Sequence, residues 1–310
     1  MVLQISELTD SRFGARVSGI SPGQISDVSD LRQLHLERLG LLCLEFDQLL
    51  KTEQLYALTT LFGDAEFAPG MITGYGKAAS NDDTPVDIET QVAALRAEGR
   101  DPYLALLGNV DGNGQQRDMD QSFYGDWEWH TDMSYIPVPP TFSLLNARQV
   151  PESGGDTWFC NLILAGRALP GDLCQRVVGQ TIKHDSTYGS SGALRPGMAP
   201  PSSPLTAIGH AHPILREIPE TGEVALFLGR RTNAYVPGLK LADSEALLNE
   251  LWAFATQPAF CYRHHWKVGE VVVWDNRVLM HRREPMKHGD SRLMWRTQTK
   301  GEVVQAFPLV

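Results

Sequence analysis

Cysteine is scarce in this chain of 310 residues, and the few that occur lie far apart. There are four, with no C-x-x-C pair among them: Cys43, Cys160, Cys174 and Cys261. This usage is typical of reduced, mostly buried thiols in a cytosolic protein. The first twenty residues also lack the basic and apolar segments of a signal peptide, so we expect a cytoplasmic protein.

Long apolar runs and an excess of positive charge are also missing. No apolar run approaches the roughly 20 residues that a membrane span needs, which predicts no membrane partner. The 27 Lys and Arg are outnumbered by 37 Asp and Glu, giving a net charge of −10. Because phosphate contacts need clustered basic residues, this balance argues against nucleic acid as the main partner. It leaves a small anionic substrate open, since a pocket can be locally positive inside an acidic protein.

What the chain does have is a series of short strand-like runs without internal repeats. Runs rich in Val, Leu, Ile and aromatic residues predict strands at Leu41–Phe46, Tyr103–Val110, Phe142–Val150, Ala225–Leu228, Val271–Trp274 and Arg292–Thr299. Apolar residues at i, i+3 and i+4 predict helices at Asp30–Leu39, Thr52–Phe62, Ile88–Glu98 and Ser244–Thr256. Residues 1–310 are therefore predicted to form a single domain, mainly β with flanking helices, of the sandwich or barrel kind.

Two segments are too rich in Gly, Pro and Ser to continue either pattern. They are Gly70–Pro85 and Thr187–Pro204, and both are predicted to be loops. Loops of this length in a folded domain are usually functional or disordered. If the protein is an enzyme, these two loops are the candidates for a lid that closes over the site.

The strongest local signal is the H-x-D pair of His130 and Asp132. On a strand, residues i and i+2 point to the same side, so an imidazole and a carboxylate would converge. They would be two ligands of a 2-His-1-carboxylate triad, which binds iron(II) and leaves positions open. His281, expected on a strand after the polar turn Asp275–Arg277, could complete the set. The alternatives are a solvated loop pair and a structural histidine.

Arg292 and Arg296 follow His281 on a predicted strand. Their spacing of four puts them on one side of that strand. Two inward arginines are costly unless they meet anions, and the planar guanidinium suits a dicarboxylate cosubstrate. Thr157, after the Gly154-Gly155-Asp156 turn, could add a hydroxyl at the same carboxylate. The alternatives are surface arginines on an edge strand and a plain hairpin turn.

In their order and spacing, these motifs resemble one family. H-x-D, G-G-D-T, W-D-N-R…H and R-x-x-x-R are similar to those of the taurine dioxygenase and chlorophenoxyacetate dioxygenase (TauD/TfdA) family of iron(II)/2-oxoglutarate-dependent dioxygenases. The resemblance covers nearly the whole chain, from Leu42–Gln48 through Phe62–Asp64 and His130–Pro140 to the C-terminal motifs. It implies a double-stranded β-helix (jelly roll). The chain departs from the family at Trp295, where many members have histidine, and over Ile72–Gln121, where substrate specificity would lie.

Carried over residue by residue, the resemblance implies Fe2+ ligands His130, Asp132 and His281. It implies that Thr157 and Arg292 hold the distal carboxylate of 2-oxoglutarate. With O2, the reaction would hydroxylate an aliphatic C–H of a small, anionic organic substrate and release succinate and CO2. Because halogenating relatives lack the carboxylate ligand, Asp132 favours hydroxylation, with desaturation or oxidative cleavage as other outcomes. The resemblance is also compatible with a homo-oligomer.

Residues other than the metal ligands are the candidates for binding the substrate. Arg296 matches a family arginine at this end, and it would need an anion of its own, such as a substrate carboxylate or sulfonate. Asp126 and Glu128 alternate just before His130, and either could hold a substrate ammonium if it reached the cavity. The alternative is that these acids are solvated loop charges, or that Arg296 serves the iron-bound end of 2-oxoglutarate.

Two other classes of protein would account for part of this pattern. A zinc hydrolase with a His/His/Asp site also keeps an open position, but it gives no reason for Arg292 and Thr157. A non-catalytic jelly-roll binding protein gives no reason for a complete triad. The pairs His264-His265 and His210-x-His212 lack a matching carboxylate pattern, and we expect both to be structural or surface residues.

Overall fold

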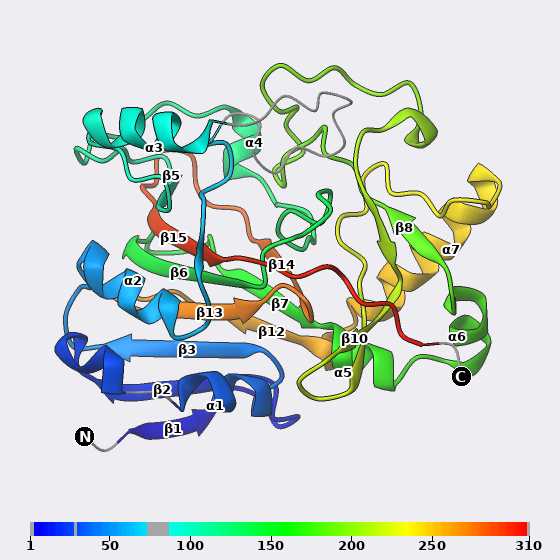
Figure 1. The fold of residues 1–310 in the computed structure, drawn as a ribbon, viewed down its shortest axis with the longest axis horizontal. Helices are drawn as coiled ribbons and strands as arrows, with labels where there is room; N and C mark the ends of the chain where they lie inside the picture. Colours follow the sequence, from blue (N-terminus) through cyan, green and yellow to red (C-terminus); the bar gives the residue numbers. More distant parts are fainter. Residues whose placement is uncertain (1–2, 28–29, 73–86, 309–310) are drawn as a thin grey trace.

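Figure 1 shows a computed structural model of the chain, which describes residues 3–27, 30–72 and 87–308. The described residues form a larger sheet of eight strands and a smaller sheet of three. The larger sheet runs in the order β1 (Gln4–Glu7), β2 (Ala15–Ile20), β3 (Leu41–Phe46), β13 (Val271–Asp275), β6 (Phe142–Gln149), β15 (Leu293–Thr299) and β4 (Ala65–Glu66), with β5 (Ala105–Gly108) also paired to β15. The smaller sheet runs β12 (Cys261–His264), β7 (Thr157–Asn161) and β14 (Leu279–Arg283).

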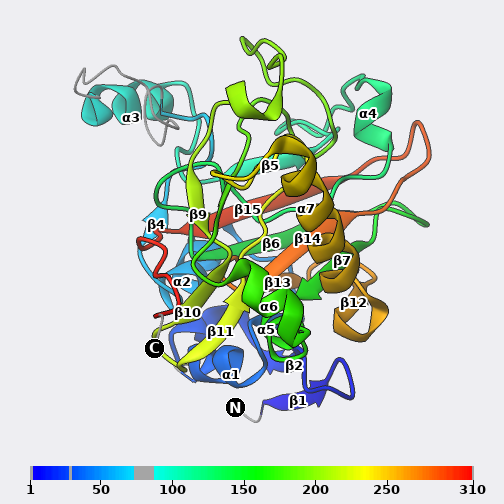
Figure 2. The same cartoon turned by 90° about the vertical axis from the view of Figure 1, so that its right-hand side faces the viewer.

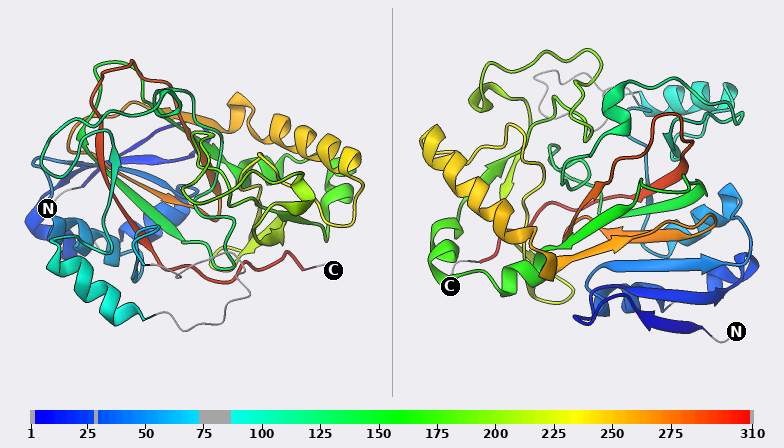
Figure 3. Two further views of the ribbon diagram at one scale, coloured as in Figure 1. Left: turned by 90° about the horizontal axis from the view of Figure 1, so that it is seen from above. Right: turned by 180° about the vertical axis from the view of Figure 1, so that it is seen from behind.

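Helices and two short two-stranded sheets surround these sheets. The two-stranded sheets are β8 (Thr181–Lys183) with β9 (Ala211–Pro213), and β10 (Leu215–Ile218) with β11 (Glu223–Leu226). The helices are α1 (Leu31–Glu37), α2 (Thr52–Thr60), α3 (Ile88–Ala97), α4 (Gln121–Tyr124), α5 (Leu162–Arg167), α6 (Gly171–Val177) and α7 (Leu241–Ala255), with 3-10 turns η1 (Pro22–Asp27), η2 (Pro204–Thr206) and η3 (Pro258–Phe260). Figure 3 shows the N-terminal strands at one edge of the larger sheet.

The central strands β3, β13 and β6 of the larger sheet are buried on both sides, which explains their continuous apolar sequences. In β13, Val271 and Val273 pack with the core under α1 and α2, while Val272 and Trp274 face the other core. This alternation follows from the two-residue period of a strand. On the second side, Phe159 of the smaller sheet meets Trp274, with ring centroids 5.7 Å apart. The two sheets therefore share a core, and α7 closes it beside the smaller sheet (Figure 2).

The predicted elements agree with the structure except near their ends. The strand β3 has the predicted bounds, whereas α7 begins at Leu241, three residues before the predicted Ser244. Asp243 in its first turn stabilises that earlier start by interacting with the helix dipole. Arg292 lies just before β15 instead of inside it. Among the described residues, no helix is long and apolar enough to cross a membrane.

The structure describes one of the two predicted loops in full and only a small part of the other. Most of Gly70–Pro85 lies outside the described residues. The segment Thr187–Pro204 is an irregular loop with a single bridge between Tyr188 and Leu194. It lies close to the site described below, because Ser190, Ser191 and Ala193 line the cavity of that site.

His35 gives the folded protein a defined pH dependence. Its ring is fully buried between Phe62 and Phe142, with centroids 5.5 and 5.3 Å away, and burial lowers its pKa to about 4. Between this value and the ordinary pKa of about 6.5, the unfolded chain binds a proton that the folded chain does not. The stabilising contribution is therefore present at pH 7 and is lost as the pH falls.

We expect His35 alone to lower the free energy of unfolding by about 2 kcal/mol between pH 7 and pH 5. Urea unfolding of the metal-free protein at both pH values measures the total change. A His35→Leu variant should show a pH dependence smaller by that amount. An unchanged difference between the two pH values in this variant would show that His35 does not resist protonation.

Candidate active site

The site begins where the segment that carries His130 meets strand β14 at His281. His130 and His281 form an isolated antiparallel bridge, in which each backbone N–H donates to the other's carbonyl oxygen at 2.9 and 2.8 Å. Asp132 follows in a turn, where Met133 has a φ of 49°. The predicted shared strand face of His130 and Asp132 is therefore wrong. The turn brings the carboxylate to the histidines instead.

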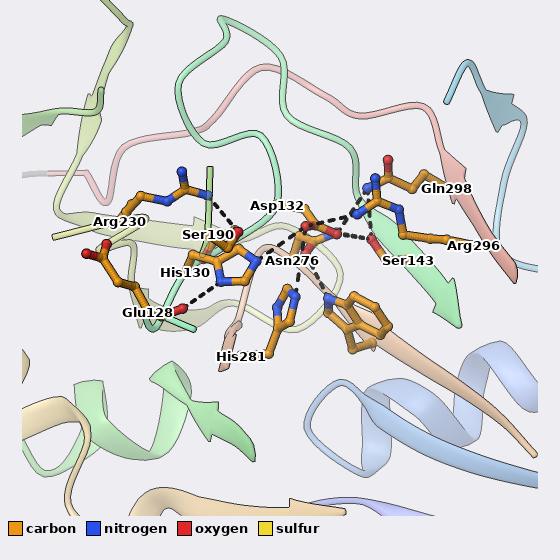
Figure 4. A network of polar contacts seen from close by, with 12 residues as sticks. Glu128, His130, Asp132, Ser143, Ser190, Arg230, Asn276, His281, Arg296 and Gln298 are labelled. Carbon is orange, nitrogen blue, oxygen red and sulfur yellow. Dashed lines mark hydrogen bonds and ion pairs between the residues drawn. The ribbon is translucent and has the colours of Figure 1, made fainter. Parts of the chain in front are cut away.

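The three side chains nevertheless converge on one point (Figure 4). Asp132 Oδ1 lies 3.8 Å from His130 Nε2 and 3.9 Å from His281 Nε2. The ligand atoms of all three residues lie within 4.8 Å of one another, and the His130 and Asp132 residues are each only 5% exposed. Two imidazole nitrogens and one carboxylate oxygen at this spacing fit a divalent iron ion and leave further coordination positions open.

Hydrogen bonds outside the triad fix which ligand atoms face this point. His130 Nδ1 donates to the carbonyl oxygen of Glu128 at 2.8 Å, which leaves Nε2 as the free nitrogen. Asp132 Oδ2 accepts from Ser143 Oγ at 2.8 Å and from Gln298 Nε2 at 3.2 Å. Oδ1 is thereby turned towards the histidines.

Ser143 and Gln298 were not predicted from the sequence. They are direct partners in the register of β6 and β15, which brings both to the same carboxylate. Asn276 donates to Ser143 Oγ at 2.9 Å, and Trp274 Nε1 donates to Asn276 Oδ1 at 2.9 Å. The W-D-N-R segment therefore supports the metal ligands through a chain of hydrogen bonds. This role gives a structural reason for the W-D-N-R segment that precedes His281 in the sequence pattern.

The protonation states of the triad suit metal binding at neutral pH. Burial raises the pKa of Asp132, but Arg296 and the two histidines outweigh burial and hold the pKa at about 2. Burial lowers the pKa of His281 to about 4, and burial together with the charge of His281 holds the pKa of His130 well below its ordinary value. The site thus presents two neutral imidazoles and a carboxylate, the forms that bind a metal.

A cavity of about 430 Å³ opens in front of the triad, and we call it the triad cavity. Its polar lining includes the three ligands with Thr157, Arg292 and Arg296. Its apolar lining includes Leu106, Met119, Phe123, Trp127, Leu145 and Trp274. The structure therefore brings together six of the seven predicted site residues. A small molecule with an apolar body and a charged end matches this lining.

Arg292 is the clearest anion-binding candidate in the triad cavity. It is 5% exposed, and its Nε has no hydrogen-bond partner among the described residues. Burial and the nearby charge of Arg283 lower its pKa to about 9. A buried guanidinium in this situation is costly unless an anion binds to it. Thr157 accepts a hydrogen bond from Trp266 Nε1 at 2.9 Å, which leaves the Thr157 hydroxyl proton available to a ligand.

Arg296 contacts one of the metal ligands directly. Its Nη1 is 3.5 Å from Asp132 Oδ1, so the Arg296 charge is already partly balanced by a ligand carboxylate. Its Nε has no hydrogen-bond partner among the described residues. Arg296 can therefore still donate into the cavity while it orients Asp132.

Asp126 does not reach the triad cavity, which corrects the expectation that it could. Its side chain is 58% exposed and pairs with Arg282 Nη1 at 2.7 Å. Arg282 follows His281 directly on β14, so its side chain points to the opposite side of that strand. Asp126 and Glu128 instead line a separate surface groove, where Glu128 accepts from Thr232 Oγ1.

His212 and His264, which were predicted to be structural or surface residues, have structural partners. His212 Nε2 hydrogen bonds with the carbonyl oxygen of Ile136 at 2.9 Å. His264, fully buried, lies 3.2 Å from Glu270 and belongs to a second group of possible metal ligands with Cys43. There, Arg16 Nη1 lies 2.7 Å from Glu270 Oε1 and already supplies a positive charge. This group is best described as a buried ion-pair network.

The chain is similar in sequence and fold to known proteins of one family. A model of the family described as "Taurine catabolism dioxygenase TauD, TfdA family" matches residues 4–298. The chain belongs to this family. The resemblance identified from the motifs is thus confirmed, and its curated relatives include alpha-ketoglutarate-dependent dioxygenases.

Three known proteins show how far the similarity to this chain extends. The (S)-phenoxypropionate/alpha-ketoglutarate-dioxygenase of Sphingobium herbicidovorans is 31% identical over 304 residues, covering 94% of this chain and 93% of the relative. A solved taurine dioxygenase from Burkholderia xenovorans has a TM-score of 0.69 at 25% identity, over 97% of this chain and 92% of its own. The structure of AAD-2 in complex with Mn(II) and N-oxalylglycine has a TM-score of 0.74 at 24% identity, over 99% and 100% of the two chains, and shares the fold.

Proposed function

We propose that this protein is an iron(II)- and 2-oxoglutarate-dependent dioxygenase that hydroxylates an aliphatic C–H bond of a small anionic substrate. The observation that carries the proposal is that the His130, Asp132 and His281 triad shares one cavity with the buried cation Arg292. A metal triad alone would fit several reactions, whereas a dicarboxylate cosubstrate explains both features. Family membership supports the same reaction class.

The chain's own residues bind and orient the reactants. His130, Asp132 and His281 would hold the iron, and Arg292 with Thr157 would hold the distal carboxylate of 2-oxoglutarate. Iron held at this triad would supply the oxidising chemistry, in which 2-oxoglutarate and O2 are consumed and succinate and CO2 are released. Ser190, Ser191 and Ala193 of the 187–204 loop line the triad cavity, so this loop would exclude water from it.

The test of this proposal is anaerobic addition of iron(II) and 2-oxoglutarate to the purified protein. A weak visible charge-transfer band should develop only when both are present, and O2 should then release succinate. A zinc hydrolase or a non-catalytic binding protein would give neither signal. Screening small carboxylic and sulfonic acids for stimulated succinate release would then identify the substrate.

We infer that Arg296 binds the anionic group of the substrate. Its position in the triad cavity and its unpartnered Nε support this role. With an identified substrate, Arg296→Ala should raise the substrate KM about tenfold or more, because a hydrogen bond to a charged group is lost. Iron affinity should be measured alongside, since Arg296 also contacts Asp132. An uncharged true substrate, or a rise in the 2-oxoglutarate KM alone, would contradict the assignment.

We also propose that the two facing sheets form a double-stranded β-helix (jelly roll), and that residues 1–310 form a single domain. The core shared by β13, β7 and β14 supports both statements. A cytoplasmic location is supported by four free cysteines. A homo-oligomer remains a prediction from the family resemblance, and gel filtration with light scattering would measure the oligomeric state.

A further inference from the structure

Arg283 is a second buried cation in the triad cavity, and none of the roles above uses it. It lies on β14 two residues after His281, so both side chains point to the cavity side of that strand. Arg283 is 4% exposed, and its Nε has no hydrogen-bond partner among the described residues. In the part of the chain that the structure describes, its hydrogen bonds go to main-chain oxygens and to a thioether instead of a carboxylate.

The strand register places Arg283 beside the two residues assigned to the cosubstrate. Arg283 is the direct partner of Thr157 across β14 and β7. It is also close enough to Arg292 for the two positive charges to repel each other. Three residues with N–H or O–H donors therefore line one cavity. Two buried guanidinium groups in such proximity are costly without an anion between or beside them.

The remaining contacts hold the Arg283 guanidinium in place. Nη2 donates to the carbonyl oxygens of Phe123 and Gly125, the latter at 3.2 Å. The guanidinium carbon lies 4.4 Å from the ring centroid of Trp127, and Trp127 N donates to the Arg283 carbonyl at 3.0 Å. These contacts position the charge without neutralising it, as expected for a preorganised anion-binding group.

We propose that Arg283 is a second cosubstrate arginine, which acts with Arg292 and Thr157 on the distal carboxylate of 2-oxoglutarate. The inference rests on the proposed function, because it takes 2-oxoglutarate as the ligand of Arg292. The competing explanation is that Arg283 only braces the cavity wall at residues 123–127. The two roles differ in one respect: a brace supports any ligand of the cavity, whereas a cosubstrate arginine recognises the distal carboxylate.

The experiment compares 2-oxoglutarate with 2-oxovalerate, which has the same carbon chain with a methyl group in place of the distal carboxylate. Dissociation constants of both acids are measured by anaerobic calorimetry with the iron(II)-loaded protein, and the quenching of tryptophan fluorescence provides a second readout. Arg283→Gln keeps an N–H donor for the main-chain carbonyls but removes the charge. It should reduce the preference for 2-oxoglutarate over 2-oxovalerate about tenfold. Arg283→Lys, which keeps the charge, should retain most of that preference.

The matched control is Arg282→Gln, because Arg282 is the adjacent arginine on the opposite side of β14 and pairs with Asp126. It should leave the preference within about twofold, since a paired charge outside the cavity is screened. If Arg283→Gln weakens the binding of both acids equally, the proposal is overturned, and Arg283 only braces the cavity wall. If the glutamine variant does not fold, Arg283→Met, which also removes the charge, replaces it. Equal weakening of the binding of both acids in a folded Arg283→Met variant would then overturn the proposal.

The same titrations separate this inference from the proposed function. If the wild type binds 2-oxoglutarate only with iron(II) and Arg292→Gln weakens that binding, the proposed function holds. An unchanged preference in Arg283→Gln would then reject the role of Arg283 alone. If the wild type does not bind 2-oxoglutarate, the proposed function fails and the role of Arg283 fails with it.

Discussion

Replacing Asp132 by alanine should abolish iron-dependent 2-oxoglutarate turnover. The change removes the single carboxylate of the triad and leaves two imidazoles that face each other across the bridge. Loss of an outer partner of a ligand already costs about 10- to 100-fold in metal affinity or activity, so loss of the ligand itself should cost more. Succinate release per protein, with iron bound at equilibrium measured in parallel, tests this result.

Asp126→Ala is the matched control for Asp132→Ala. Asp126 is also an aspartate near His130, but it is paired with Arg282 outside the triad cavity. This variant should keep turnover close to that of the wild type, since an exposed ion pair contributes little. Near-wild-type turnover in Asp132→Ala would remove Asp132 from the ligand set. The same comparison applies to His130→Ala and His281→Ala.

Replacing Arg292 by alanine should raise the requirement for 2-oxoglutarate by at least about 30-fold. The reason is that loss of a buried, charge-assisted pair costs on the order of 2–5 kcal/mol. Thr157→Val should cost less, about 1 kcal/mol, because it removes one hydrogen bond. Anaerobic titration of 2-oxoglutarate into the iron-loaded variants gives the dissociation constants directly.

An exposed arginine provides the control for the loss of charge in Arg292→Ala. Arg176 pairs with Glu250 on the surface and is 45% exposed, so Arg176→Ala should leave 2-oxoglutarate binding unchanged. If Arg292→Ala binds 2-oxoglutarate as the wild type does, then Arg292 does not hold the cosubstrate. A Thr157→Val effect as large as that of Arg292→Ala would contradict the proposed division of roles.

The ligand motifs could be predicted from the sequence because short spacings carry local geometry. His130 and Asp132 are two residues apart, and either a strand or a tight turn brings such residues together. The actual turn was not predictable, because Met133 adopts a positive φ that no turn-forming residue announces. The convergence was therefore predicted correctly while the local conformation was not.

The supporting residues depended on pairings between distant strands, which the sequence does not encode locally. Ser143 and Gln298 are separated by 155 residues, half the length of the chain, and meet only through the register of β6 and β15. Arg283 stands opposite Thr157 only through the pairing of β14 with β7. A one-residue shift in either register would turn these side chains to the other side of the sheet.

Asp126 shows why a sequence pattern can also predict a contact that does not form. Its alternation with Glu128 before His130 suggested a common direction, but residues 126–129 lie outside any regular strand. Ion pairing with Arg282 then determines where the Asp126 carboxylate lies. Alternation predicts direction only where a ladder of hydrogen bonds enforces it.

The reciprocal bridge between His130 and His281 has a thermodynamic consequence. Because their main chains are joined in both directions, most of the conformational entropy of bringing these two ligands together is lost when the protein folds. Metal uptake then has to order little more than the Asp132 turn. We therefore expect the metal-free protein to be folded, in contrast to small zinc domains whose apo forms are unfolded, while metal bound to the folded state still adds to its stability.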